Sequence, residues 1–163
     1  MRLSLHTDFA LRALMFLAAR SGRASVNDIS GFFGISRDHL AKVAQRLSQE
    51  GYIRTLRGVG GGLELVRSPE EIRIGEVIEA FEGSMHLLDC VAVPNLCVIQ
   101  PGCRLRGVLA EAERIQREYL NSVRLADVIT PASSIVELTM PVAAKHSQTS
   151  AAKPGRSRKK ART

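Results

Sequence analysis

The sequence predicts a mainly α-helical fold, a winged helix-turn-helix with a two-stranded wing, followed by a cysteine-bearing loop and a long helix. Three observations predict it. Three segments before residue 50 carry apolar residues at helical spacing, strand-like residues follow Gly51, and a second helical seam follows Cys103. We therefore divide the chain into a winged helix-turn-helix region (1–68), a short helix and loop (69–103), a long helix (104–130) and a basic tail (131–163).

The first helix is predicted to begin at Thr7, whose hydroxyl can cap it, and to carry Asp8 in its first turn. Residues 9–18 are apolar on most sides, which is typical of a buried helix. Gly22 is expected to end it.

Two shorter helices follow. Ser25 can cap the second, which Gly34 ends, and Ser36 can cap the third, which Gly51 ends. The buried face of the third helix is expected to hold Leu40, Val43, Ala44 and Leu47. Two helices joined by so short a connection have the shape of a helix-turn-helix.

A hairpin is predicted next, with strands over 52–56 and 63–66 and a glycine-rich tip over 57–62. A nucleotide-binding loop is excluded, because such a loop opens a helix and here a second strand follows.

Charge is distributed unevenly along the 163 residues, which hold 23 Lys and Arg against 16 Asp and Glu and so carry a net charge of +7. Residues 1–67 carry +5, residues 68–141 carry −5, and residues 142–163 carry +7. A basic winged helix-turn-helix indicates DNA binding, with the third helix in the major groove and the wing along the backbone or minor groove. The candidate DNA contacts are Ser36, Arg37, His39 and Lys42 on the third helix and Arg57, Gly58, Gly60 and Gly61 in the wing.

Other classes of protein are less well supported. The third helix could simply present a solvated polar face, and the tail, expected to be disordered, could be a solubilising end or a non-specific phosphate-binding arm. A non-specific basic nucleic-acid-binding protein is therefore the more remote alternative. The scattered histidines form no catalytic relay, so we expect no enzyme. The densest apolar run, 9–19, contains Arg12 and no cleavable leader precedes it, so we expect a cytoplasmic protein without membrane contact.

A short helix is predicted over 74–81 and a long loop over 82–102. The helix that follows carries a seam of about two heptads formed by Leu105, Val108, Ala112, Ile115 and Tyr119. One chain has little left to cover this seam, so we expect a homodimer through the long helix. The alternative is that the helix packs on its own domain.

Cys90, Cys97 and Cys103 lie in the loop and at the start of the long helix. Their spacing does not match the paired C-x2-C units of a structural zinc ribbon. Three thiolates with wider gaps suit an iron-sulfur cluster, and the helix N-terminus and the nearby Arg104 and Arg106 favour an anionic group. Free buried thiols are the alternative.

At this point the sequence resembles the Rrf2-type family of iron-sulfur winged-helix transcriptional repressors. The resemblance covers about residues 1–130. It is carried by residues 7–14, 35–40, 57–62, 72–78, 103–105 and 125–127 and by the three cysteines. It is strongest to the nitric-oxide-sensitive members, which implies a homodimer on a palindromic promoter operator and a 4Fe-4S or, alternatively, 2Fe-2S cluster whose reaction with nitric oxide releases the DNA.

The resemblance also bears on the fourth cluster ligand. Some members of the family use a His three residues after the third cysteine, where this chain has Arg106. The nitric-oxide-sensitive members carry an Asp at the start of the first helix, which matches Asp8, and we expect Asp8 of the partner subunit to complete the site. Asp8 could instead be a plain helix-start acid, and the substitute ligands are His6, His86 and Asp89.

One spacing departs from the pattern of the nitric-oxide-sensitive members. The first gap between cysteines is six residues, where those members usually have five. The alternative function is therefore an iron-responsive or iron-sulfur-status-responsive regulator of the same family.

Overall fold

The computed structural model describes residues 2–20, 22–83 and 86–129 of the chain. The elements, in order, are α1 (Leu5–Arg20), α2 (Val26–Phe33), α3 (Arg37–Gln49), β1 (Ile53–Leu56), β2 (Gly62–Leu65), α4 (Ile74–Glu82), α5 (Asp89–Ala92), the 3-10 turn η1 (Gln100–Gly102), α6 (Arg104–Ser122) and the 3-10 turn η2 (Leu125–Val128). The predicted tail, 131–163, lies outside the described residues.

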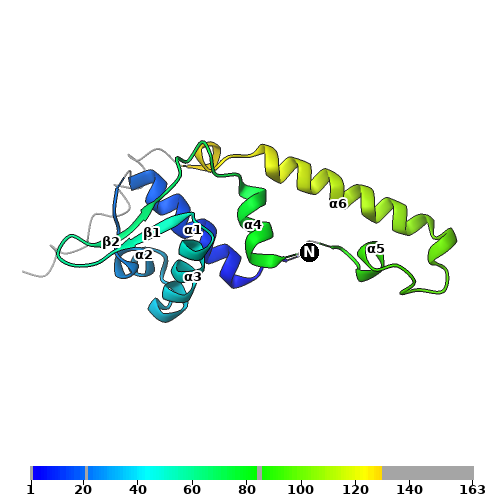
Figure 1. The fold of residues 1–163 in the computed structure, drawn as a ribbon, viewed down its shortest axis with the longest axis horizontal. Helices are drawn as coiled ribbons and strands as arrows, with labels where there is room; N and C mark the ends of the chain where they lie inside the picture. The colour runs from blue at the N-terminus through cyan, green and yellow to red at the C-terminus, as the bar shows by residue number, and fades with distance from the viewer. Residues whose placement is uncertain (1, 21, 84–85, 130–163) are drawn as a thin grey trace, which may run out of the picture.

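Two parts of the molecule are distinct in Figure 1. Helices α1 to α4 and the hairpin pack together, and we call this part, with residues 123–129, the body. Helix α6 extends away from it with α5 beside its far end, and we call residues 86–122 the cysteine arm. No helix among the described residues is both long and apolar enough to cross a bilayer.

Helix α1 is buried on most sides, as predicted, and forms the centre of the body. Leu14 and Leu17 are almost fully buried in it and belong to one core with Ile29 of α2, Leu40 of α3 and Ile53 of β1. Burial of this many aliphatic side chains is the main stabilising contribution to the body.

The predicted capping role of Thr7 is wrong, because α1 begins earlier, at Leu5. The Ser4 hydroxyl accepts a hydrogen bond from the Thr7 amide at 3.3 Å, and the Ser4 carbonyl accepts one from the Asp8 amide at 3.1 Å. Ser4 is therefore the cap. Thr7 lies inside the first turn, fully buried, and its hydroxyl donates to Glu82 at the end of α4.

The helix-turn-helix is confirmed. Ser25 and Asp28 form a reciprocal capping box at the start of α2: the Ser25 amide donates to the Asp28 carboxylate at 2.8 Å, and the Asp28 amide donates to the Ser25 hydroxyl at 3.1 Å. The hydrogen bonds with the Ser25 backbone and side chain hold the pKa of Asp28 below its usual value. Gly34 ends α2 in the left-handed conformation, at φ 64°. Ser36 precedes α3 but its side chain makes no capping hydrogen bond.

The wing is an antiparallel pair whose register runs from Ile53 opposite Leu65 to Leu56 opposite Gly62. The first predicted strand, 52–56, starts one residue too early, and the second, 63–66, lies one residue too late at both ends. The Val66 amide still donates to the Tyr52 carbonyl at 3.0 Å. A bridge that we did not predict joins Ala24, between α1 and α2, to Leu63 through hydrogen bonds of 3.1 and 2.8 Å. The base of the wing is thereby attached to the helices.

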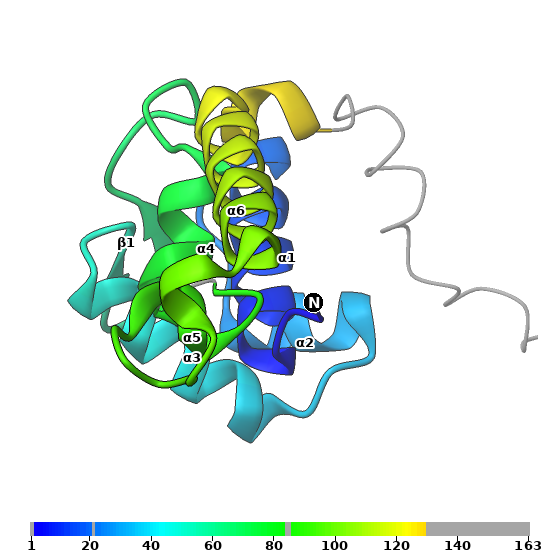
Figure 2. The same cartoon turned by 90° about the vertical axis from the view of Figure 1, so that its right-hand side faces the viewer.

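The end of α6 returns to the body. The Ile74 amide donates to the Val123 carbonyl at 2.9 Å, and the Leu125 amide donates to the Ile72 carbonyl at 2.7 Å. Gly75 of α4 packs so closely on α6 that an added Cβ would lie 2.9 Å from the Asn121 amide nitrogen. Figure 2, which looks nearly along α6, shows α4 beside it.

The predicted loop over 82–102 is in fact partly helical, because α4 extends to Glu82 and the loop contains α5 and η1. These turns give the cysteine arm a defined backbone.

Candidate DNA interface and cysteine site

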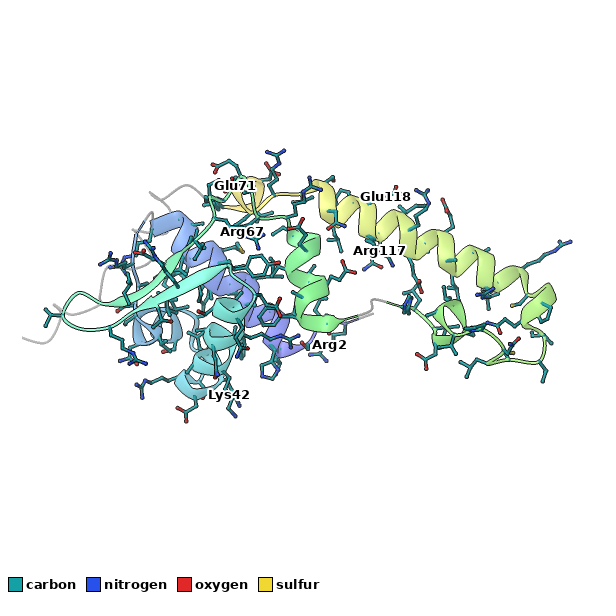
Figure 3. The ribbon with its side chains drawn as sticks, in the orientation of Figure 1. Arg2, Lys42, Arg67, Glu71, Arg117 and Glu118 are labelled. Atoms are coloured by element: carbon teal, nitrogen blue, oxygen red, sulfur yellow. The ribbon has the colours of Figure 1, made fainter. Side chains whose placement is uncertain are left out.

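The outer face of α3 is exposed and polar. Ser36, Arg37, His39 and Lys42, the predicted contacts, are all exposed, while Leu40 on the opposite face is fully buried. Figure 3 shows the Lys42 side chain pointing away from the body. The structure therefore leaves this face of α3 free to enter a groove of DNA.

The four predicted wing residues differ in exposure. Arg57, Gly58 and Gly60 are exposed, and both glycines have positive φ, 93° and 76°. Gly61 is half-buried, its amide donates to the Gly58 carbonyl at 3.0 Å, and an added Cβ would lie 2.9 Å from that same oxygen. Gly61 thus shapes the turn, because no larger residue fits there.

Sequence reasoning missed two cations and an apolar tip at the wing. Arg23 and Arg54 both bind the Glu64 carboxylate, Arg23 through Nε at 2.6 Å, and these hydrogen bonds lower the pKa of Glu64. The two arginines remain about half exposed or more and add positive charge beside the strands. Val59 is fully exposed at the tip. An apolar residue between glycines in a predicted hairpin tip is the signal that could have indicated it.

The three cysteines are free thiols in one segment of the arm. Cys90 lies in α5 and is half-buried, Cys97 is exposed ahead of η1, and Cys103 is half-buried at the N-cap of α6, as predicted. Across residues 2–20, 22–83 and 86–129, no three His, Cys, Asp or Glu side chains are gathered so as to hold a metal ion.

The donors nevertheless suit an iron-sulfur cluster in kind. Three unpaired thiols lie within one loop, and Cys103 stands at the N-terminus of a 19-residue helix whose dipole favours an anion. Three cysteines leave one position of such a cluster for another ligand.

Arg106 is half-buried, and its guanidinium contacts the cysteine loop. Its Nε donates to the Cys90 carbonyl at 2.9 Å and a terminal nitrogen donates to the Val91 carbonyl at 3.1 Å. The residue that stands where some members of the resembled family carry a histidine therefore holds the backbone of the cysteine loop.

Asp8 lies in the first turn of α1, with its side chain 39% exposed and bonded to Arg12 Nε at 2.8 Å. Within one chain it does not join the cysteines in a ligand group. Among the substitute ligands, His6 and Asp89 are exposed, whereas His86 is bonded through Nδ1 to the buried Glu113 at 2.9 Å.

The seam of α6 is exposed along its length, so the helix does not pack this face on its own domain. The exposed fraction is 58% for Leu105, 54% for Ile115 and 67% for Tyr119. Such a row of uncovered apolar side chains is typical of a surface that another chain covers.

Comparisons with known proteins agree with this geometry. The chain is similar to the "HTH-type transcriptional regulator NsrR" of Bacillus subtilis (strain 168), with 43% identity over 85% of this chain and 97% of the relative. Its fold is similar to that of "T. potens IscR", with a TM-score of 0.62 and 25% identity over 78% of this chain and 85% of that one. It is also similar in fold to CymR, the "Global Cysteine Regulator of B. subtilis", with a TM-score of 0.67 and 23% identity over 82% and 98% of the two chains.

These relatives are regulators of transcription rather than enzymes. The profile of the Rrf2 family, described as "Iron-dependent Transcriptional regulator", matches residues 3–131. The chain therefore belongs to the Rrf2 family of transcriptional regulators.

Proposed function

We propose that this protein is a homodimeric repressor that binds a palindromic promoter operator and that nitric oxide releases it by reacting at an iron-sulfur cluster. Cys90, Cys97 and Cys103 would hold the cluster, of the 4Fe-4S rather than the 2Fe-2S type, with Asp8 of the partner subunit as the fourth ligand. The observation that carries the proposal is the set of three free cysteines in one loop of a chain 43% identical to a regulator named NsrR.

The body supplies the DNA-binding surface. The exposed face of α3 offers side chains for base edges, and Arg57 with Arg23 and Arg54 beside the wing offers charge for phosphates. A dimer through α6 would present two copies of α3, and a two-fold axis between them requires a palindromic site.

The cluster, when bound, supplies iron that reacts with nitric oxide, and the chain's own contribution is to connect that site to α3. The start of α1 is bonded to the end of α4, because Glu82 accepts hydrogen bonds from the Thr7 hydroxyl and from the Ser4 amide at 2.7 Å. These bonds lower the pKa of Glu82, and the bond from the Thr7 hydroxyl lowers it most. A bond from the cluster to Asp8, the next residue after Thr7, would therefore affect the position of α4.

The end of α4 is in turn bonded to α3. The Arg46 guanidinium donates to the Ala80 carbonyl and lies 4.8 Å from the centre of the Phe81 ring. The first turn of α1, the end of α4 and the DNA-facing helix thus form one connected unit. This connection supports a mechanism in which a ligand bond at Asp8 changes the separation of the two α3 helices.

Asp8 is available for that bond at small cost. Its salt bridge with Arg12 joins two side chains that are 39% and 46% exposed, and exposed pairs at this spacing contribute only about 0.3–0.5 kcal/mol.

The test is the absorption spectrum of anaerobically purified protein before and after addition of nitric oxide, measured alongside operator binding. We expect a cluster spectrum that nitric oxide abolishes or alters, together with loss of operator affinity. A colourless protein that binds its operator equally well throughout would refute the proposal.

The role of Asp8 is tested separately by Asp8→Ala against Arg12→Ala, which removes the salt bridge but keeps the carboxylate. We expect Asp8→Ala to shorten the lifetime of the cluster and weaken operator binding, and Arg12→Ala to change neither. Equal effects of the two variants would show that Asp8 acts only through its helical ion pair.

The second candidate function is an iron or cluster-status regulator. The family description, which names iron dependence, and the six-residue cysteine gap favour it. Release of DNA on iron depletion, with no response to nitric oxide, would identify this function instead.

A further inference from the structure

Gln100 is a buried polar residue in a segment that is otherwise exposed. Its exposed fraction is 8%, whereas the preceding Val98 and Ile99 are 98% and 65% exposed. A polar side chain withdrawn from water is stable only with hydrogen-bond partners. The hydrogen-bond partners of Gln100 therefore show which parts of this segment it holds together.

The Gln100 side chain spans both sides of the cysteine loop. Its Nε2 donates to the carbonyls of Cys90 and Val93, each at 2.8 Å, and its Oε1 accepts from the Leu96 amide at 3.1 Å. Both amide protons and one acceptor position are used.

The Gln100 main chain completes the arrangement. Its amide donates to the Cys97 carbonyl at 3.0 Å, and its carbonyl accepts from the Cys103 amide at 3.3 Å. One residue is thus hydrogen-bonded to the backbone of all three cysteines.

Arg106 adds a second connection from α6. The Cys90 carbonyl accepts from Arg106 Nε as well as from Gln100 Nε2, and the Val91 carbonyl accepts from the same guanidinium. Two donors on one carbonyl hold α5 both to the loop and to the long helix.

We propose that Gln100 is a positioning residue that sets the backbone of the cysteine loop before any cluster is bound, with Arg106 as its support. The importance of this loop rests on the proposed function, but the organising role of Gln100 does not. An amide is required at this position, because a carboxylate would place oxygens against the carbonyls of Cys90 and Val93.

The experiment uses full-length, cluster-free protein and compares Gln100→Ala and Gln100→Glu with the parent. Hydrogen exchange and the rate of alkylation of each thiol by iodoacetamide are measured by mass spectrometry. We expect the Leu96 amide to exchange about ten-fold faster in Gln100→Ala, the change that loss of one hydrogen bond brings. Gln100→Glu keeps an acceptor for the Leu96 amide but loses both bonds to the Cys90 and Val93 carbonyls, so its effect should show mainly in alkylation. Cys90 and Cys103 should approach the alkylation rate of the exposed Cys97.

The matched control is Gln116→Glu, which makes the same charge change on the half-buried side of α6 in the same arm. We expect it to leave exchange and alkylation at parental rates. Arg106→Lys keeps the charge but loses the two-pronged contact, so it should accelerate Cys90 alone. Far-UV circular dichroism confirms that each variant retains its helices.

The outcomes separate this inference from the proposed function. Parental exchange at Leu96 and parental alkylation of Cys90 and Cys103 in both Gln100 variants would overturn the role of Gln100. A parent protein that takes up no cluster on anaerobic reconstitution would refute the proposed function alone, and the role of Gln100 would still be decided by exchange and alkylation. In a cluster-binding parent, we expect both Gln100 variants to lose the cluster absorption faster.

Discussion

The body and the cysteine arm are each stabilised by a different kind of internal contact. In the body the buried residues are mostly aliphatic, such as Leu14, Leu40 and Leu125. In residues 86–122 only Gln100 and Glu113 are buried, and both are polar. Most of the large apolar side chains of the arm, Val98 and Ile115 among them, are exposed instead, and the others are only half-buried.

This difference indicates which interactions stabilise each region. The body has a hydrophobic core of its own, whereas the arm keeps its shape in one chain through hydrogen bonds and leaves its apolar surface for another chain. Four predictions test this contrast, and they follow from the largest expected effect to the smallest.

The strongest test is a charge in the seam of α6. In a homodimer, Ile115→Asp would bury one carboxylate from each chain in the interface. We therefore expect the dimer dissociation constant to rise by about a thousand-fold while the body stays folded. Analytical ultracentrifugation measures this. Ala110→Asp, which is exposed outside the seam of the same helix, is the matched control and should leave the dimer intact. Equal dissociation by the two variants would remove the seam from the interface.

The second test compares one aliphatic side chain from each region. Leu14→Ala removes a fully buried side chain from the core of the body, and we expect the free energy of unfolding to fall by about 3 kcal/mol. Val98→Ala in the arm should change it by less than about 0.5 kcal/mol, because Val98 is 98% exposed. Urea denaturation at a fixed protein concentration measures both, and similar losses would contradict the contrast.

The third test removes a polar contact of the arm. Glu113 accepts hydrogen bonds from the Leu87 amide at 2.6 Å and from His86. Burial acts to raise the pKa of Glu113, but these bonds outweigh it and the pKa lies below its usual value of 4.5. We expect Glu113→Gln to cost about 1.5 kcal/mol at pH 7.

The pH dependence gives this prediction a sign. Because the pKa of Glu113 is lowered by folding, its contribution is complete above the usual value and is lost as the pH falls through the lower folded value. The difference in unfolding free energy between parent and Glu113→Gln should therefore shrink below pH 4.5. A difference that is constant from pH 7 to pH 3 would show that the carboxylate's charge is not what holds the arm.

The smallest effect concerns surface charge. The Lys42 side chain on α3 points away from the body, so we expect Lys42→Ala to reduce the slope of log affinity against log salt concentration by about 1 in operator binding. Arg117→Ala, on the exposed surface of α6, should leave the slope unchanged. A change of slope with Arg117→Ala would place the arm against DNA.

Much of the body follows from local sequence rules. Ser25 with Asp28, and Gly34 after them, are capping signals within a few residues of one another, and the helix that they delimit, α2, is the one observed. Thr7 misled because a competing cap, Ser4, stands three residues upstream, and because the true partner of Thr7 is Glu82, 75 residues away.

The arm was less predictable because its contacts are long-range and polar. The cysteine spacing indicated a cluster loop, but nothing in the residues around Gln100 distinguishes it from an ordinary loop glutamine beside Pro101. From the sequence, Arg106 was interpreted as positive charge near the cysteines and as a departure from the histidine of some family members, but its contact with α5 depends on how α6 lies. The pairing of Ala24 with Leu63 escaped for the same reason, since one residue carries no strand periodicity.

Helices α4 and α6 cross and pack closely where Gly75 meets Asn121, near the C-terminal end of α6. Helix α6 has 19 residues and so is about 28 Å long, and the backbone hydrogen bonds that join its end of the chain to the body are those of Val123 and Leu125, just after its C-terminus. A rotation of about 5° at the crossing would therefore carry the cysteine end through about 2 Å. Ala80 and Phe81, which contact Arg46 of α3, lie on α4 of the same crossing, so the angle of this crossing sets where the cysteine end lies relative to α3.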